Sequence, residues 1–353
     1  MLDPANAEDP NQPMLLVQNA SGWHQVYVDL ELEISVLGYD LRIKSASSEF
    51  EVSIPEPAWK RSASRFGLTR RLLRLGIHGV DRHGSDELVV LITGAFFAVN
   101  LNTGSARELH RFRVGKRPLA DGWLIDSFGR IVYGEYWFND AKRAVNIWRS
   151  DEEISNWEVI ASFPSGSIRH VHAIHPISDD LSLIATGDHD SESGIWSLEN
   201  GRLSLIEGGS QLWRTVSLQK VGSDYMFGTD SPDEQNYIVR APIDGSGELT
   251  KEIAVDGPVY YSRRVGDWLL FATTVERGKA ETDDWVTLWY SKGDGEWQSY
   301  RVAQKDRLPN RYFGHAVLQF PRGVAPAERK VPVWVDAVGS SRQSNVRSRS
   351  ARM

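Results

Sequence analysis

Short, mainly apolar stretches separated by polar turns dominate the hydrophobic pattern of this chain. Leu88–Ile92, Leu181–Ala185 and Trp268–Phe271 are three such stretches, and each follows a turn-forming run of glycine, aspartate or serine. Stretches of this length with such boundaries are typical of buried β-strands. No segment in the middle of the chain keeps a 3.6-residue apolar period long enough to indicate a helix. The pattern therefore predicts an all-β protein.

An apolar pair followed by a polar turn recurs along the chain at a nearly constant interval. The five pairs are Ala98-Val99, Ile147-Trp148, Ile195-Trp196, Ile238-Val239 and Leu288-Trp289. Their second members are 49, 48, 43 and 50 residues apart, and Val333-Trp334 follows 45 residues later. A strand around Val52–Ile54 lies about one repeat before the first pair. Such a period indicates a repeat architecture.

Periods of about 40 to 50 residues with short strands and Gly/Asp turns are typical of β-propeller blades. The anchors and the N-terminal strands predict a seven-bladed β-propeller, with six or eight blades as alternatives. We expect strands within residues 15–54 to share a blade with the C-terminal segment and close the ring. The propeller is expected to span residues 15–339, after a flexible N-terminus (1–14) and before a disordered basic tail (340–353).

Composition narrows the possible partners. The chain has 47 acidic and 40 basic residues and a net charge of −7, which argues against nonspecific nucleic-acid binding. No run of about 20 apolar residues indicates a membrane span, and no secretory signal is visible, so we expect a cytoplasmic protein unless a leader was removed. There is no cysteine, which excludes thiolate metal sites. The sequence leaves the oligomeric state open.

Polar and aromatic residues recur where the repeat predicts one mouth of the central channel. In a propeller, the ends of the second strands and the starts of the first strands meet there. Second-strand ends carry Glu135, Tyr136, Asp188, Asp190 and Asp230, and first-strand starts carry Arg169, His170, His172, Gln211, Trp213, Arg214, Tyr260, Tyr261 and His315. This mouth is the candidate site.

His170 and His172 are the most prominent residues of this set. They lie two apart on a predicted strand, so both side chains are expected on one face. They are interpreted either as a general base with a neighbour or as a hydrogen-bonded structural pair. His172, Asp188 and Asp190 combine imidazole with carboxylate oxygens and are candidate ligands of a divalent cation. Turn capping explains the acidic residues equally simply, so no cofactor is predicted and the cation remains an alternative.

Arginines and aromatic residues suggest the kind of ligand. Arg169 and Arg214 present planar forks suited to a carboxylate, unless they form salt bridges within the protein. Trp213, Tyr260 and Tyr261 offer faces on which a sugar stacks, although blade packing also uses aromatic residues. The arginine-rich segment 61–74 is interpreted as a solvated connection or as a patch for an anionic ligand.

Two turns resemble a known motif. In the segment Ser150–Trp157, Ser150 and Trp157 keep the spacing of the Asp-box pattern Ser-x-Asp-x-Gly-x-Thr-Trp, while Glu152 and Ile154 replace Asp and Gly. Ser291–Trp297 is a shortened version. The chain therefore resembles sialidase-like Asp-box propellers over residues 120–300. Relatives of this architecture include glycosidases and propeller-type ulvan lyases, which use His, Tyr and Arg on uronic-acid polysaccharides. The arginine triad and the Tyr/Glu pair of sialidases are missing, so the resemblance does not extend to sialic acid hydrolysis.

These observations predict an enzyme that cleaves an acidic, uronic-acid-containing glycan by β-elimination. His170 or His172 is the expected base, Arg169 or Arg214 neutralises the carboxylate, and Tyr136 is the acid. A glycoside hydrolase is the first alternative, because Glu135, Asp188 and Asp230 offer the two carboxylates that it requires. A non-catalytic propeller that binds a glycan or a protein is the second alternative.

Overall fold

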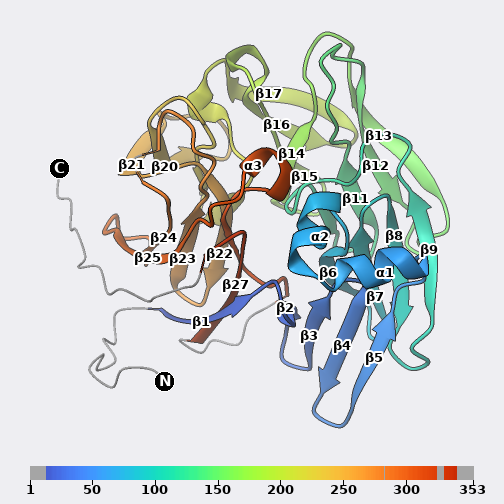
Figure 1. Cartoon of the computed structure of the whole chain (residues 1–353). Helices are drawn as coiled ribbons and strands as arrows, with labels where there is room; N and C mark the ends of the chain where they lie inside the picture. The colour runs from blue at the N-terminus through green and yellow to red at the C-terminus, as the bar shows by residue number, and fades with distance from the viewer. Residues whose placement is uncertain (1–12, 282, 324–329, 340–353) are drawn as a thin grey trace.

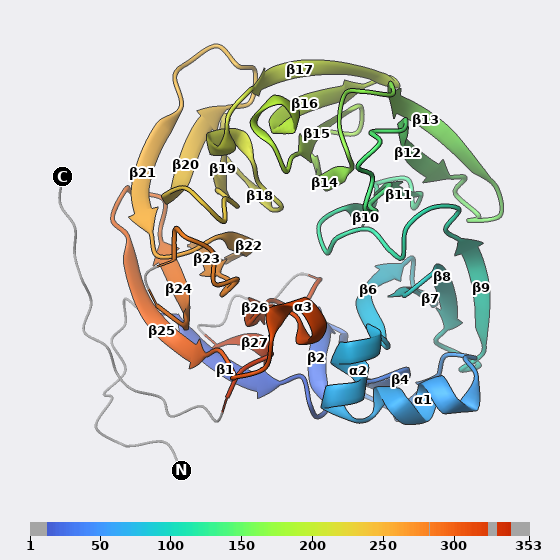
Figure 2. The same ribbon diagram turned by 45° about the horizontal axis from the view of Figure 1, so that its top comes forward.

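Seven β-sheets arranged as blades around a central opening form the protein (Figures 1 and 2). The computed structural model describes residues 13–281, 283–323 and 330–339. The predicted all-β, seven-bladed propeller is confirmed. Of the predicted terminal segments, the tail 340–353 and residues 1–12 lie outside the described residues, whereas Met14 already belongs to a strand.

Each of the first six blades is a four-stranded antiparallel meander in chain order. Blades 1 to 3 contain β2 (His24–Val28), β3 (Leu32–Leu37), β4 (Asp40–Ser45), β5 (Glu49–Ser53); β6 (Ile77–His83), β7 (Glu87–Ile92), β8 (Ala95–Asn100), β9 (Ala106–Arg111); and β10 (Trp123–Ile125), β11 (Ile131–Gly134), β12 (Val145–Ser150), β13 (Trp157–Phe163). Blades 4 to 6 contain β14 (Val171–Pro176), β15 (Leu181–Thr186), β16 (Gly194–Glu199), β17 (Arg202–Gly208); β18 (Leu218–Val221), β19 (Asp224–Gly228), β20 (Asn236–Pro242), β21 (Thr250–Val255); and β22 (Val259–Val265), β23 (Trp268–Thr273), β24 (Trp285–Ser291), β25 (Gln298–Gln304). Figure 2 shows first strands such as β14, β18 and β22 next to the opening and fourth strands such as β17, β21 and β25 at the periphery.

Blade 7 closes the ring with strands from both ends of the chain. Its sheet has the order β26 (Val317–Gln319), β27 (Lys330–Asp336), β1 (Met14–Asn19), and β1 pairs with β27 in parallel. The expectation that all strands within 15–54 join this blade was therefore too broad, because β2 to β5 form blade 1 on their own. The anchor Val333-Trp334 accordingly lies in the second strand of its blade, and Val52 lies in a fourth strand.

The five regular apolar pairs lie in third strands, and in blades 3 to 5 the pairing with the fourth strand changes register at the pair itself. Such β-bulges occur at Ile147/Trp148, Ile195/Trp196 and Ile238/Val239. A bulge inserts one extra residue and increases the local twist. In blades 2 and 6 the register shifts two residues before the pair, at Phe96/Phe97 and Val286/Thr287, so the five pairs lie at or just after the bulge of their third strands.

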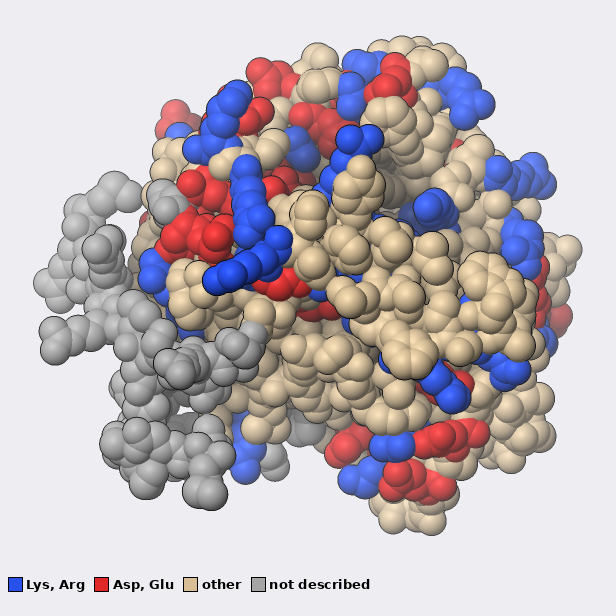
Figure 3. Space-filling model, in the orientation of Figure 1, with Lys and Arg blue, Asp and Glu red and all other residues tan. Residues whose placement is uncertain are grey.

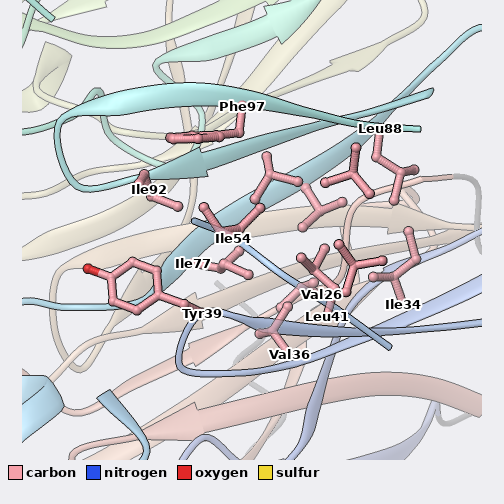
Figure 4. Close-up of a cluster of buried hydrophobic side chains, with 14 of the residues drawn as sticks. Val26, Ile34, Val36, Tyr39, Leu41, Ile54, Ile77, Leu88, Ile92 and Phe97 are labelled. Carbon is pink, nitrogen blue, oxygen red and sulfur yellow. The ribbon is translucent and has the colours of Figure 1, made fainter. Parts of the chain in front are cut away.

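Apolar side chains pack between neighbouring sheets and fill the ring. Figure 4 shows part of the cluster between the first two blades, where Ile34 and Leu41 of blade 1 and Leu88 of blade 2 are fully buried. Close contact of the blades requires glycine at some second-strand ends. A Cβ on Gly134 would lie 2.4 Å from the Cβ of Val171, at the start of the next blade.

Two short helices occupy the arginine-rich segment that links blades 1 and 2. These are α1 (Ala58–Ser64) and α2 (Gly67–Leu73); a third, α3 (Asn310–Phe313), precedes blade 7. Sequence reasoning did not predict them, because seven residues are too few to show a 3.6-residue period. Arg70 donates to the carbonyl oxygen of Ala20, which follows β1, and pairs with Asp336 of β27 at 3.3 Å, so α2 is held against the closing blade. Arg71 pairs at 2.6 Å with Asp306, which follows blade 6.

The helices share one face of the ring. In Figure 3 this face is largely uncharged over α1 and α2, with Lys and Arg at the border of the uncharged area. Trp59, Phe66 and Leu68 are among its exposed apolar side chains. None of the described helices is long and apolar enough to cross a membrane.

Candidate functional site

A cavity of about 640 Å³ opens at the mouth of the channel beside α2 and α3. Its volume is within the range of about 300–1,000 Å³ typical of small-molecule sites. The candidate residues that line it are Tyr136, His172, Asp188, Arg214, Asp230, Tyr260, Tyr261 and His315. The structure therefore brings together residues from blades 3 to 7 that are far apart in the sequence.

β-Bulges at the starts of first strands direct side chains into this cavity. The register between first and second strands shifts across His78 in blade 2, His172 in blade 4 and Tyr260 in blade 6. All three residues line the cavity. A bulged residue leaves the regular in–out alternation of its strand, which re-aims its side chain. His172 therefore reaches the mouth as a bulge residue, whereas His170 precedes the strand.

His170 and His172 nevertheless meet. Their Nε2 atoms are 3.1 Å apart, and Asp188 Oδ2 and Oδ1 lie 3.3 Å and 3.6 Å from them, respectively. The Nδ1 atom of His170 is 3.0 Å from the carbonyl oxygen of Trp137, and that of His172 is 3.1 Å from the carbonyl oxygen of Thr215. Because a carbonyl oxygen only accepts, each Nδ1 carries a proton and donates it.

Both Nε2 atoms therefore present lone pairs to the same point unless a further proton lies between them. Two lone pairs at 3.1 Å repel each other, and a proton or a cation between them removes the repulsion. Both imidazoles are buried, and burial lowers the pKa of His172 to about 4, which disfavours protonation of this ring. The three side chains offer ligand atoms within 4.8 Å of one another. Two imidazole nitrogens and a carboxylate are a donor set suited to a divalent transition-metal ion.

Asp188 is held by positive charge as well as by the imidazoles. Burial opposes ionisation of this carboxyl, yet its pKa is well below the usual range because the adjacent His170 and His172 side chains favour the charged form. Arg169 Nη1 lies 3.6 Å from Asp188 Oδ2, and Arg214 Nη2 lies 3.5 Å from Asp188 Oδ1. The backbone of Asp188 has φ +116°, an uncommon conformation for a residue other than glycine. Such strain persists only where the surroundings fix it.

Arg214 connects Asp188 with a second acidic group. Its Nε lies 3.3 Å from Asp230 Oδ2, while the buried Asp230 Oδ1 has no hydrogen-bond partner among the described residues. Burial raises the pKa of Asp230 to about 6. Burial and the charge of Asp230 raise the pKa of Glu276 to about 8, and Tyr260 donates a hydrogen bond to this carboxyl. The site thus combines one firmly ionised carboxylate with two that titrate near neutrality.

Several candidate residues lie outside the cavity lining. The Glu135 carboxylate accepts hydrogen bonds from Trp148 Nε1 at 3.0 Å and from the backbone of Asn146, which gives it a role within its own blade. Trp213 packs against Phe227 in the core. Trp213 and Gln211 belong to a short 3-10 helix rather than to the start of a strand.

The remaining candidates surround the His170–His172–Asp188 cluster. Gln211 donates to Asp190 Oδ1 at 3.0 Å, so Asp190 is a turn residue outside the cluster. His170 does not line the cavity, but its ring lies 4.2 Å from that of Tyr136, which does. Arg169 reaches the cluster through the side chain of Asp188.

The opposite wall of the cavity carries further basic residues. They include Arg70, Arg71, Arg74, His78, Lys116 and Arg117. The first three belong to the arginine-rich segment 61–74, for which an anionic-ligand patch was one of two interpretations, whereas the sequence analysis missed the other three. The six residues come from α2, from a bulge and from the link between blades 2 and 3, which have no repeated pattern. Glu276 was also missed, although it follows β23 by three residues, almost as Asp188 and Asp230 follow β15 and β19 by two.

The Ser150–Trp157 segment is the turn between β12 and β13. Asp151 organises it by accepting hydrogen bonds from the backbone of Ser155 and Asn156, and Ile154 adopts φ +54° at the position of the motif's glycine. The segment is thus a hairpin turn remote from the lining of the cavity. The resemblance to the sialidase Asp-box type is not confirmed.

Known proteins are similar to this chain in fold alone. No model of a protein family matches it, and no curated protein matches it. A solved structure of an oligogalacturonate lyase in complex with manganese has a TM-score of 0.54 and 12% identity, over 90% of each chain. An oligogalacturonate lyase from Vibrio parahaemolyticus also has a TM-score of 0.54 and 12% identity, over 85% of this chain and 87% of that chain.

Proposed function

We propose that this protein cleaves an acidic, uronic-acid-containing glycan by β-elimination in the mouth cavity. One observation carries the proposal: the unpartnered oxygen of Asp230, the guanidinium of Arg214 and the His170–His172–Asp188 cluster belong to one connected site. Base, carboxylate-neutralising group and cation ligands are the groups that removal of a proton beside a carboxylate requires. The similarity in fold to solved oligogalacturonate lyases agrees with this class of substrate.

His170, His172 and Asp188 would hold a divalent cation in this proposal. Their Nε2 atoms and carboxylate already converge, and the Nδ1 hydrogen bonds to backbone carbonyls fix both rings in the required tautomer. When bound, the cation supplies Lewis-acid polarisation of the substrate carboxylate, which acidifies the adjacent C–H bond. Manganese in one of the similar structures is in keeping with this donor set.

The chain's own residues would move the protons. Asp230 Oδ1 takes the proton from the carbon beside the uronate carboxylate, and its pKa of about 6 leaves it ionised at neutral pH. The electron pair of that C–H bond forms the new C=C bond, and the bond to the glycosidic oxygen breaks. Tyr136 gives its proton to the leaving oxygen; burial raises the pKa of Tyr136 to about 12, so it holds that proton until then.

The sequence analysis predicted His170 or His172 as the general base, whereas this proposal assigns that role to Asp230. With no cation bound, the unprotonated Nε2 of His172 is itself a base, so the two versions differ in their dependence on metal. Loss of turnover on chelation, with recovery on adding manganese, supports His170 and His172 as ligands. Turnover that persists after chelation and is abolished by His172→Gln supports the imidazole as the base.

The test is turnover of uronic-acid oligosaccharides, measured by the ultraviolet absorbance of the unsaturated product. We expect the wild type and the control Asp267→Asn, an exposed carboxylate away from the cavity, to give this absorbance. Asp188→Asn and Asp230→Asn are expected to lose it. Equal turnover by all four proteins, or no absorbance with any uronide, would contradict the proposal.

A glycoside hydrolase is the second candidate, and one observation favours it. Asp188 remains ionised while Glu276 has its pKa raised to about 8, and separated pKa values are typical of a base and acid pair. Hydrolysis releases reducing ends without ultraviolet absorbance, so measuring both products in one reaction distinguishes the two chemistries.

A further inference from the structure

The wall of the cavity opposite the His170–His172–Asp188 cluster is basic and unpaired. Arg74 is at the C-terminal end of α2, and Lys116 and Arg117 are in the link between β9 and β10. Figure 2 shows α2 and β14 on different sides of the opening. All three basic residues line the same cavity as His172 and Asp188.

The ion pairs of the cavity are unequally distributed. Arg70, Arg71 and Arg214 each pair with a carboxylate. In contrast, no carboxylate among the described residues lies within ion-pair distance of Arg74, Lys116 or Arg117, and Asp121, the remaining acidic lining residue, pairs with none of them. This concentration of free positive charge occurs in a chain whose net charge is −7.

The unpaired basic side chains repel one another, which destabilises their charged forms. Burial and the charge of Arg117 hold the pKa of His78 well below its usual value, and burial lowers the pKa of Arg117 itself, with Arg74 adding to the effect. The Nη2 atom of Arg71, whose side chain is only 10% exposed, has no hydrogen-bond partner among the described residues, although this residue also lines the cavity. An anion at this wall would offset the repulsion and accept the free donor.

The structure holds these groups in place before any ligand arrives. His78 Nε2 is 2.9 Å from Thr93 Oγ1, which donates to the carbonyl oxygen of Arg74 at 2.6 Å. Gly115 has φ +72°, and a Cβ on it would lie 2.2 Å from the carbonyl oxygen of Tyr136. Only glycine therefore allows the link to lie this close to blade 3, with Lys116 and Arg117 at the cavity. Preorganised donors reduce the entropy lost on binding.

We infer that Arg74, Lys116 and Arg117 form a second anion subsite, which binds a further acidic group of the ligand that occupies the His170–His172–Asp188 side. The inference rests on the proposed function for the identity of the ligand, and it narrows that ligand to a glycan with at least two acidic groups. We therefore expect a diuronide, which carries two carboxylates, to engage both walls, and a monouronide to engage one. In this inference, the preference for a second acidic group comes from the end of α2 and from the link between β9 and β10, both outside the cluster.

The first arm of the test uses inorganic sulfate and needs no assumption about glycans. We expect low millimolar sulfate, compared with chloride at equal ionic strength, to raise the melting temperature of the wild type. The control Arg202→Gln, an exposed arginine on the outer strand β17, should retain this increase. Arg74→Gln/Arg117→Gln should lose it, and Lys116→Gln, on the exposed part of the link, should reduce it if the double variant does not fold.

The second arm compares a monouronide with a diuronide by calorimetry in the Asp230→Asn background, which is expected not to turn over. We expect the diuronide to bind at least about tenfold more tightly, in line with one additional charge-assisted contact. This ratio should approach one when Arg74→Gln/Arg117→Gln is added. An unchanged ratio together with an unchanged sulfate response overturns the inference but leaves the proposed function standing. A sulfate response that depends on Arg74 and Arg117, with no uronide bound, supports the subsite and refutes the proposed function.

Discussion

Gly187 is the residue through which the geometry of the His170–His172–Asp188 cluster is most directly tested. It lies between the end of β15 and Asp188, and a Cβ at this position would be 2.7 Å from His172 Cε1 and 3.0 Å from Arg214 Cγ. Since carbon atoms pack at about 3.5–4.0 Å, Gly187→Ala has to displace the His172 ring by about 0.8 Å. That ring is 2% exposed and bonded to a backbone carbonyl, so it has little room to move.

We expect Gly187→Ala to lower the free energy of unfolding by about 1–3 kcal/mol, the usual effect of overpacking a filled interior. Cation binding should suffer more, because ligand distances tolerate only about 0.2 Å. Urea denaturation measures the first effect and calorimetric titration with manganese measures the second. Gly22→Ala is the matched control, because its Cβ would have no neighbour closer than 3.9 Å. If Gly187→Ala retains both the stability and the manganese affinity of Gly22→Ala, the packing of His172 described above is wrong.

Three further predictions concern the same region. Asp188→Asn should weaken manganese binding by about tenfold to hundredfold in calorimetric titrations, because the change removes a ligand and loosens the orientation of both imidazoles. Unchanged affinity would exclude this cluster as the cation site. Turnover should rise with pH through about 6, because Asp230 must be ionised to act as the base. The titration of the same carboxyl should make the free energy of unfolding fall from about pH 4 to 6. In that window the folded carboxyl keeps a proton that the unfolded one, with a pKa near 3.9, has released; Asp230→Asn should flatten this fall in denaturation curves recorded across the pH range. In Gly134→Ala the new Cβ would lie 2.4 Å from Val171, so the free energy of unfolding measured in urea should fall by about 1–3 kcal/mol. If the variant is as stable as the wild type, blades 3 and 4 separate easily at this contact.

The fold was predictable because each blade repeats the same physical requirement. A third strand packed between two neighbouring sheets needs apolar residues at the same place in each blade, and this produced the regular pairs such as Ile195-Trp196. The same register brought Asp188 and Asp230 to one mouth, since both follow second strands by two residues. The sequence predicted that N-terminal strands complete the last blade, but the period does not show how many of them do so. For this reason β1 was not singled out within residues 15–54.

The repeat did not predict the other wall of the cavity, although a patch for an anionic ligand was one of the two interpretations of the arginine-rich segment 61–74. Arg74 and Arg117 lie in links between blades, where length and conformation vary freely and no repeat applies. The position of His172 depends on a bulge, which changes the direction of a side chain without altering the hydrophobic pattern. The ionisation of Asp230 and Glu276 depends on burial and on neighbouring charges such as that of Arg214, which are properties of the assembled ring.

The parallel pairing of β1 with β27 has a consequence for synthesis of the chain. Asn19 ends β1 and Lys330 begins β27, so the two strands leave the ribosome 311 residues apart. At about 5–20 residues per second, β1 waits roughly 15–60 s for its partner. During that interval its backbone groups have no neighbouring strand on either side, a state in which strands readily pair with other chains. The yield of native protein should therefore depend on translation speed and on chaperones, and a circular permutant that places β1 directly after β27 should relieve that dependence.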